Sequence, residues 1–183
     1  MEYELGVNAP WRRFFARIVD LNFFSIVYGS IAGLVIGLLQ PQLLATMLFT
    51  NPLVSTMVSA YFASILSGLF VGGVGTSPGK YLFGLKLRTI NGELLGLTSG
   101  VRRDIRVYVQ GLGFGIPIVL YMSSFWSKGI LEKEGVTPWD KGQYTMSVMK
   151  DSLKRKILTS IGVLSFIILL FINAFLQVLG RTL

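Results

Sequence analysis

A long stretch without ionisable side chains constrains this chain more than any other feature of its sequence. Residues 21–79 contain no Asp, Glu, Lys, Arg or His. The stretch is too long for one crossing of a hydrocarbon core about 30 Å thick, and it has the length for two crossings. Pro41, Asn51 and Pro52 interrupt its middle, where a hairpin between two spans would turn. The sequence therefore predicts transmembrane helices at about residues 18–40 and 52–74.

The composition agrees with a membrane protein and excludes several classes of active site. Only 14% of the 183 residues are charged, against roughly 25% in soluble domains. The chain has no cysteine and no histidine, which excludes thiolate and imidazole metal sites and most serine, cysteine and zinc hydrolase mechanisms. We expect one membrane domain over residues 1–183 that is not an enzyme and binds no metal or cofactor. The net charge of +8 indicates basic residues beside anionic lipid headgroups rather than nucleic-acid binding.

The distribution of basic residues predicts how the chain is oriented in the membrane. Arg12, Arg13 and Arg17 precede the first span, and residues 76–106 hold six basic residues against two acidic ones. The positive-inside rule places both segments in the cytoplasm. The N-terminus is then cytoplasmic, and the uncharged linker at residues 41–51 faces outward.

The next apolar segment allows two topologies. Residues 107–127 carry no charge, but their centre holds three glycines and Pro117, which disfavour a straight helix. Residues 128–156, with seven basic residues against four acidic ones, also favour the cytoplasm. We favour a broken, re-entrant segment that returns to the cytoplasmic side; a straight helix would instead complete a four-helix bundle. A further span is predicted at residues 157–180.

Small residues at helical spacing mark two faces on which helices could pack. Close approach of backbones drives helix association in lipid, so such stripes favour contacts between spans or between copies of the chain. One stripe lies in each of the first two spans: Gly29, Gly33 and Gly37, and Ser59, Ala63 and Ser67.

A short β element is predicted in the cytoplasmic segment. Asn91-Gly92 suits a type I′ turn, so residues 86–90 and 93–97 could form a hairpin on the membrane surface.

Asp20 is the strongest candidate for a functional residue, because a carboxylate just inside an apolar span is costly and needs a partner or a role. Arg13, Arg17 and Asp20 share one helix face. In one interpretation the arginines reach the headgroups and Arg17 neutralises Asp20. In the other, Asp20 forms a cation or proton site whose charge state Arg17 sets.

Two loops carry motifs with competing interpretations. Residues 75–80 (Gly-Thr-Ser-Pro-Gly-Lys) resemble a phosphate-binding loop, but Val74 and Tyr81 replace residues which that pattern requires. A tight turn at the end of the second span fits better. Thr137-Pro-Trp-Asp140 has the order of a helix start, with Thr137 as the cap, and Trp139 suits the membrane interface.

These motifs together resemble the RDD family of bacterial membrane proteins, which is named for one arginine and two aspartates. Residues 13–20 are similar to its opening motif and would supply Arg17 and Asp20. Residues 75–80, with Asn91-Gly92 downstream, are similar to its central motif. Asp140, followed by Thr145 and Val148, is similar to its closing motif. The resemblance covers residues 10–148, and it implies that Arg17, Lys80 and Asp140 belong to one cytoplasmic cluster. Residues 143–148 could then form a strand that pairs with residues 86–90.

The expected protein is all-α, with three transmembrane helices, one re-entrant segment and a small cytoplasmic-side β-hairpin. It would lie in the bacterial inner membrane, beside anionic lipid headgroups, as a homo-oligomer. The leading functional hypothesis is a small secondary transporter that exchanges Na⁺ or Li⁺ for protons, as the resemblance implies for some members. Asp20 would carry the ion, and Asp140 and Lys80 would form the gate. The alternative is a membrane scaffold or binding subunit in which Arg17, Asp20, Lys80 and Asp140 form a structural latch.

Overall fold

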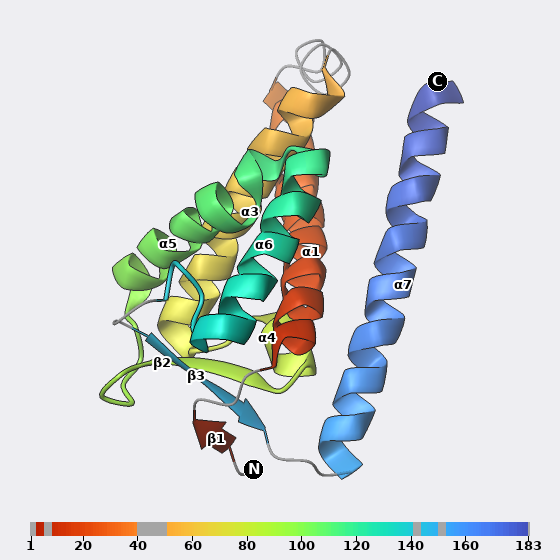
Figure 1. Cartoon of the computed structure of the whole chain (residues 1–183). Coiled ribbons are helices and arrows are strands. Elements are labelled where there is room, and N and C mark those ends of the chain that lie inside the picture. Colours follow the sequence, from red (N-terminus) through yellow and green to blue (C-terminus); the bar gives the residue numbers. More distant parts are fainter. Residues whose placement is uncertain (1–2, 6–8, 40–50, 141–143, 150–152, 183) are drawn as a thin grey trace.

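Two long antiparallel helices form the centre of the fold in the computed structural model, which describes residues 3–5, 9–39, 51–140, 144–149 and 153–182 (Figure 1). They are α1 (Pro10–Leu39) and α3 (Pro52–Val74). Both are long and apolar enough to cross a membrane. The second predicted span matches α3, whereas the first helix begins earlier than predicted and so includes the basic residues before the apolar run.

Local signals in the sequence determine both ends of α3. The side chain of Asn51 accepts hydrogen bonds from the N–H groups of Leu53 and Val54, at 3.1 and 3.4 Å, and Pro52 follows in the first turn. Gly75 ends the helix in the left-handed conformation, with its N–H bonded to the carbonyl of Val71. Of the outward linker predicted at residues 41–51, only Asn51 lies within the described residues.

The segment after the second span enters the bundle and turns back, and the predicted break in its helix is present. It consists of α5 (Leu97–Arg106), the π-helical turn η1 (Val107–Gly111), the short turn η2 (Gly113–Gly115) and α6 (Pro117–Glu134). Residues 113–115 all have positive φ, so the chain cannot continue as a helix there. In Figure 1, α5 rises beside α3 and α6 descends towards the end that carries the sheet.

Three strands form a small antiparallel sheet at one end of the bundle. Their order is β1 (Tyr3–Leu5), β3 (Tyr144–Met149), β2 (Leu85–Thr89). The predicted pairing of residues 86–90 with 143–148 is confirmed over the described residues, with Leu85 opposite Val148. The hairpin predicted at Asn91-Gly92 is wrong, because residues 93–97 form no strand. A type I′ turn needs positive φ at both central residues, and here Gly92 has it but Asn91 does not.

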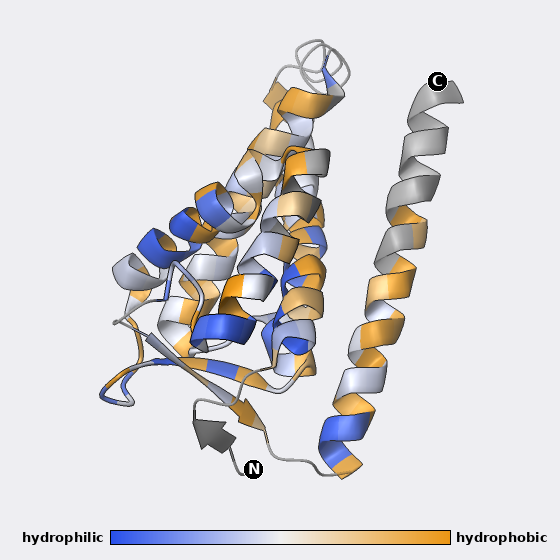
Figure 2. Ribbon diagram, in the orientation of Figure 1, coloured by the Kyte–Doolittle hydropathy of each residue, from blue (hydrophilic) through white to orange (hydrophobic). Residues whose placement is uncertain are grey.

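The last helix, α7 (Leu153–Thr182), contains the predicted span at residues 157–180 and packs on α1 and α4 (Pro78–Leu82). The rings of Phe15 and Phe166 lie 5.8 Å apart, and Gly162 lies against the ring of Phe83. In Figure 2, hydrophobic residues run along α1, α3 and the coloured part of α7, and hydrophilic residues gather along α5 and near the sheet. The polar end of the bundle is therefore the end that holds the candidate site.

The small-residue stripes behave differently in the two helices. Gly68 and Gly72 of α3 lie so close to Gly96 and Gly100 of α5 that a Cβ on any of Gly68, Gly72 or Gly100 would meet backbone atoms of the other helix. In the predicted stripe of α3, Ala63 and Ser67 are buried and Ser59 is half-buried; in that of α1, Gly37 is half-buried. In contrast, no atom lies within 4 Å of where a Cβ would stand on Gly29 or Gly33. These two glycines therefore bring α1 close to no other described element of the same chain.

Candidate functional site

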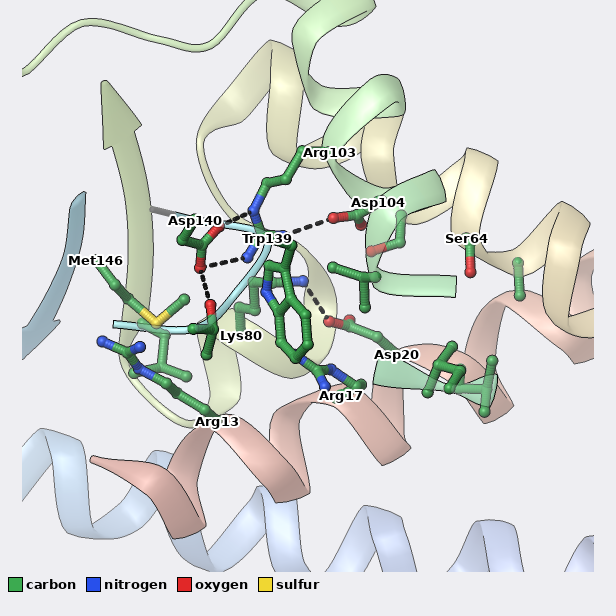
Figure 3. Close-up of a pocket in the computed structure, with 17 residues that line it drawn as sticks. Arg13, Arg17, Asp20, Ser64, Lys80, Arg103, Asp104, Trp139, Asp140 and Met146 are labelled. Carbon is green, nitrogen blue, oxygen red and sulfur yellow. Dashed lines mark hydrogen bonds and ion pairs between the residues drawn. The ribbon is translucent and has the colours of Figure 1, made fainter. Parts of the chain in front are cut away.

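Asp20 is buried at the polar end of α1, with 3% of its surface exposed, and accepts three hydrogen bonds. Its carboxylate receives the hydroxyl of Ser77 at 2.5 Å, the N–H of Gly79 at 2.7 Å and the ammonium of Lys80 at 3.0 Å. Figure 3 shows Lys80 and Asp20 joined in this way. The ion pair is nearly dry, because only 11% of the Lys80 side chain and 4% of the Asp20 side chain are exposed. A buried carboxylate of this kind is tolerated because charged and polar donors compensate it.

Asp20 is held by residues 77–80, the cap and first turn of α4 rather than the predicted tight turn, and a glycine makes the approach possible. A Cβ on Gly79 would collide with the carbonyl oxygen of Ala16 and stand 2.9 Å from Oδ1 of Asp20. The lysine of the loop reaches the carboxylate directly and also donates to Ser77. The motif that resembles a phosphate loop thus binds a carboxylate of the same chain.

A second buried ion cluster surrounds Arg103 on α5. Its guanidinium donates to both carboxylate oxygens of Asp140, at 2.6 and 3.0 Å, and to Asp104 at 2.6 Å. The hydroxyl of Thr137 donates to Asp140 at 2.7 Å. Burial raises the pKa of Asp140, but the charge and hydrogen bonds of Arg103, aided by Thr137 and Arg13, outweigh it, so the pKa lies below its usual range. Burial lowers the pKa of Arg103, and its two carboxylate partners more than reverse this.

The sequence predicted that Arg17 interacts with Asp20. In the structure Arg17 lies against Trp139 instead. The centre of its guanidinium is 4.4 Å from the centroid of the indole ring (Figure 3), within the range of a cation–π interaction. Trp139 is 2% exposed, so it packs inside the protein and does not contact the surroundings. Residues 137–140 form a turn rather than a helix start, since Thr137 donates to Asp140 instead of capping a helix.

Both clusters line one cavity of about 40 Å³, which has room for one or a few water molecules. Asp20 and Lys80 lie on its wall with Arg103 and Asp140, and Arg13, Arg17 and Ala63 complete the polar and small lining. Among the described residues no three Asp, Glu, His or Cys side chains gather as a metal site would require. The arrangement therefore places buried carboxylates and cations around one small polar space.

The motifs and their positions agree with a comparison to known protein families. The sequence model of the RDD family matches residues 7–182. The chain belongs to the RDD family. The match takes in the C-terminal helix, which the motif resemblance left outside. Searches of curated proteins and of solved structures found no match. With two helices apolar enough to span a bilayer, this RDD protein is a membrane protein.

The structure of the RDD protein brings together Asp20, Lys80, Arg13, Arg17 and Asp140, which the sequence had singled out. The sequence analysis missed Arg103, because the basic residues were expected beside anionic lipid headgroups. A signal was present, since Arg103 follows Gly100 by three residues and therefore lies near the helix face on which Gly100 meets α3. Arg103 is therefore buried where the neighbouring Arg102 is exposed.

The lowered pKa of Asp140 predicts that acid destabilises the protein. Folding favours the ionised form of Asp140. The stabilisation that this carboxylate provides is complete above its unfolded pKa of about 4, and it is lost as pH falls through its lower pKa in the folded state. We expect the melting temperature of the protein in detergent to fall as pH decreases from about 5 to about 3. The Asp140→Asn variant should be less stable at pH 7 and lose less on acidification. Equal slopes for both proteins would contradict this assignment.

Proposed function

We propose that this RDD protein is a small secondary transporter of the bacterial inner membrane that exchanges Na⁺ or Li⁺ for protons. The observation that carries the proposal is Asp20, a carboxylate buried on a helix with the length and hydropathy of a membrane span. Ionisable residues inside spans often mark ion pathways and proton relays. The carboxylate also borders a polar cavity, from which a small cation or a proton could reach it.

The two ion pairs suit different roles in such an exchanger. Asp20 is paired with Lys80, whose ammonium can release its proton when its counter-ion is taken by another cation. Asp140 is paired with Arg103 through two hydrogen bonds, and a guanidinium stays protonated. Binding of Na⁺ to Asp20 would displace the ammonium and expel a proton, while the Arg103 pair holds the cytoplasmic face closed. Asp140 would thus belong to the gate rather than to the exchanging pair.

A topology with three spans accompanies the proposal. The helices α1, α3 and α7 would cross the bilayer, and α5 and α6 would enter it and return. The return of α6 supports this, since it brings Asp140 back to Arg103 at the start of the re-entrant segment. The N-terminus would be cytoplasmic and the C-terminus external. A reporter fused after Leu183 that reads as cytoplasmic would remove this topology. A single chain encloses little space for water, so we propose that the working unit is a homo-oligomer.

The exchanger predicts a loss of transport when Asp20 loses its charge. In liposomes that hold the purified protein, a Na⁺ or Li⁺ gradient should drive proton flux in the wild type and only background flux in Asp20→Asn. Lys80→Gln should also lose coupling, because it removes the group that releases the proton. Glu93→Gln changes an exposed carboxylate and serves as the control. Equal flux in the wild type and Asp20→Asn would rule out the mechanism.

A second candidate, a membrane scaffold with a structural latch, is favoured by one observation. Asp20 already accepts three hydrogen bonds and Asp140 three, so both carboxylates are fully compensated within the fold. A latch predicts that Asp20→Asn melts at a lower temperature in detergent and that the wild-type protein carries no ion flux. The flux of the wild type therefore decides between the two functions.

A further inference from the structure

A groove between α1 and α6 is lined by cationic rather than acidic side chains. It is a cavity of about 30 Å³ next to the buried ion pairs, and its polar lining consists of Arg13, Arg17, Ser127, Lys128, Thr137 and Trp139. We call it the basic groove. Three of these side chains are cationic, and no carboxylate lines the groove. One of the three, Lys128, forms an ion pair with Glu132, with 3.3 Å between Nζ and Oε1, and it also lies over the ring of Trp11.

Several buried donors of the basic groove have no partner within the described chain. The indole N–H of Trp139, the hydroxyl of Ser127 and Nε of Arg13 make no hydrogen bond there. Trp139 and Ser127 are 2% and 4% exposed. A buried polar group without a partner is costly, so native proteins pair nearly all of them with protein, water or a ligand. Unpartnered donors on three residues that line one small cavity indicate an acceptor in that cavity.

The balance of charges around the buried ion pairs also favours a bound acceptor with negative charge. Around the first cavity lie four cations, Arg13, Arg17, Lys80 and Arg103, and three carboxylates, Asp20, Asp104 and Asp140. Lys128 of the basic groove is paired with Glu132. Lys80 neutralises Asp20, while Arg103 serves both other carboxylates. One positive charge therefore remains, and it falls on the arginines of α1, because within the described residues Arg17 lies against the indole ring of Trp139 and forms no ion pair within 4 Å. A buried surplus of positive charge favours an anion.

We propose that the basic groove binds a phosphate group. Guanidinium groups match phosphate oxygens with paired N–H donors, and an indole N–H and a hydroxyl can complete the coordination. The phosphate could belong to a lipid headgroup, because the groove lies at the start of a membrane-crossing helix, or to a free ion from the cytoplasm. The site does not depend on the transport proposed for Asp20, which concerns the other cavity.

The test measures phosphate binding to the full-length protein in an uncharged maltoside detergent, in gluconate buffer of fixed ionic strength. The first probe is radiolabelled inorganic phosphate, by equilibrium dialysis. The second is phosphatidylglycerol retained in native mass spectrometry, compared with an uncharged diacylglycerol. Arg13→Gln and Trp139→Phe each remove a donor, and the phenyl ring can still cover Arg17. Arg102→Gln removes an exposed charge elsewhere and serves as the control.

We expect one of the probes to bind the wild type and the Arg102→Gln control alike, and to bind Arg13→Gln and Trp139→Phe about tenfold or more weakly. Binding of inorganic phosphate identifies a free anion, and retention of phosphatidylglycerol alone identifies a lipid headgroup. Absence of binding by both probes would overturn the proposal. So would equal binding to the wild type and Trp139→Phe, or an equal loss in Arg13→Gln and Arg102→Gln, which would indicate surface charge only. None of these results depends on ion flux.

Discussion

Replacing Arg103 with methionine is expected to destabilise the protein by about 3–5 kcal/mol, the cost of leaving buried charges uncompensated. Arg103 is 2% exposed and serves two buried carboxylates, Asp104 and Asp140, through three hydrogen bonds of 2.6–3.0 Å. Methionine fills a similar volume but neutralises neither carboxylate. The melting temperature in detergent should therefore fall strongly, and the yield of folded protein should fall with it.

Two further variants separate charge from packing in this experiment. Arg102→Met changes the exposed neighbour and should alter stability by less than about 0.5 kcal/mol. Adding Asp140→Asn to Arg103→Met removes one of the stranded charges and should recover part of the lost stability, so the double variant should melt above Arg103→Met. If Arg103→Met melts with the wild type, Arg103 does not hold the two carboxylates in solution.

The sequence was most informative where a single segment determines its own structure. The charge-free run predicted two apolar helices because hydrocarbon thickness sets their length, and both helices are present. The glycines and Pro117 predicted the break before α6, because residues 113–115 need positive φ. The pairing of β2 with β3 was also predicted, because the family resemblance placed the closing motif on the cytoplasmic side of the membrane, where Lys86 lies. In each case local geometry or a single topological constraint was sufficient.

The partners of the buried charges could not be predicted in the same way. Arg17 and Asp20 lie three residues apart on one helix, which suggested a pair, yet Asp20 binds Lys80, which lies 60 residues away in the chain. Arg17 meets Trp139 only because α6 returns to the polar end of the bundle. The Asn91-Gly92 hairpin is absent, and β2 pairs instead with β3, which lies far along the chain. Such pairings depend on how distant segments meet, and short motifs do not encode this.

Packing and charge are coupled through the contact between α3 and α5. Gly100 allows α5 to lie against the backbone of α3 at Gly68 and Gly72, and Arg103 follows Gly100 by less than one helical turn. The depth at which Arg103 enters the bundle is therefore set by the glycine contact. A change that pushes α5 away would also pull the guanidinium from Asp140.

The Gly100→Ala variant is consequently expected to lose about 3 kcal/mol or more, at the upper end of the range for overpacked cores. Its Cβ would collide with the carbonyl oxygen of Gly68 and stand 2.7 Å from Cα of Gly72, and these backbone atoms cannot move aside as a side chain would. Gly129→Ala is the matched control, because a Cβ there meets nothing within 4 Å and alanine favours a helix. Thermal unfolding in detergent compares the two. The control should melt with the wild type or slightly above it, whereas Gly100→Ala should melt far lower and lose the extra acid sensitivity that ionised Asp140 confers. Equal melting of the two variants would show that α3 and α5 do not approach this closely.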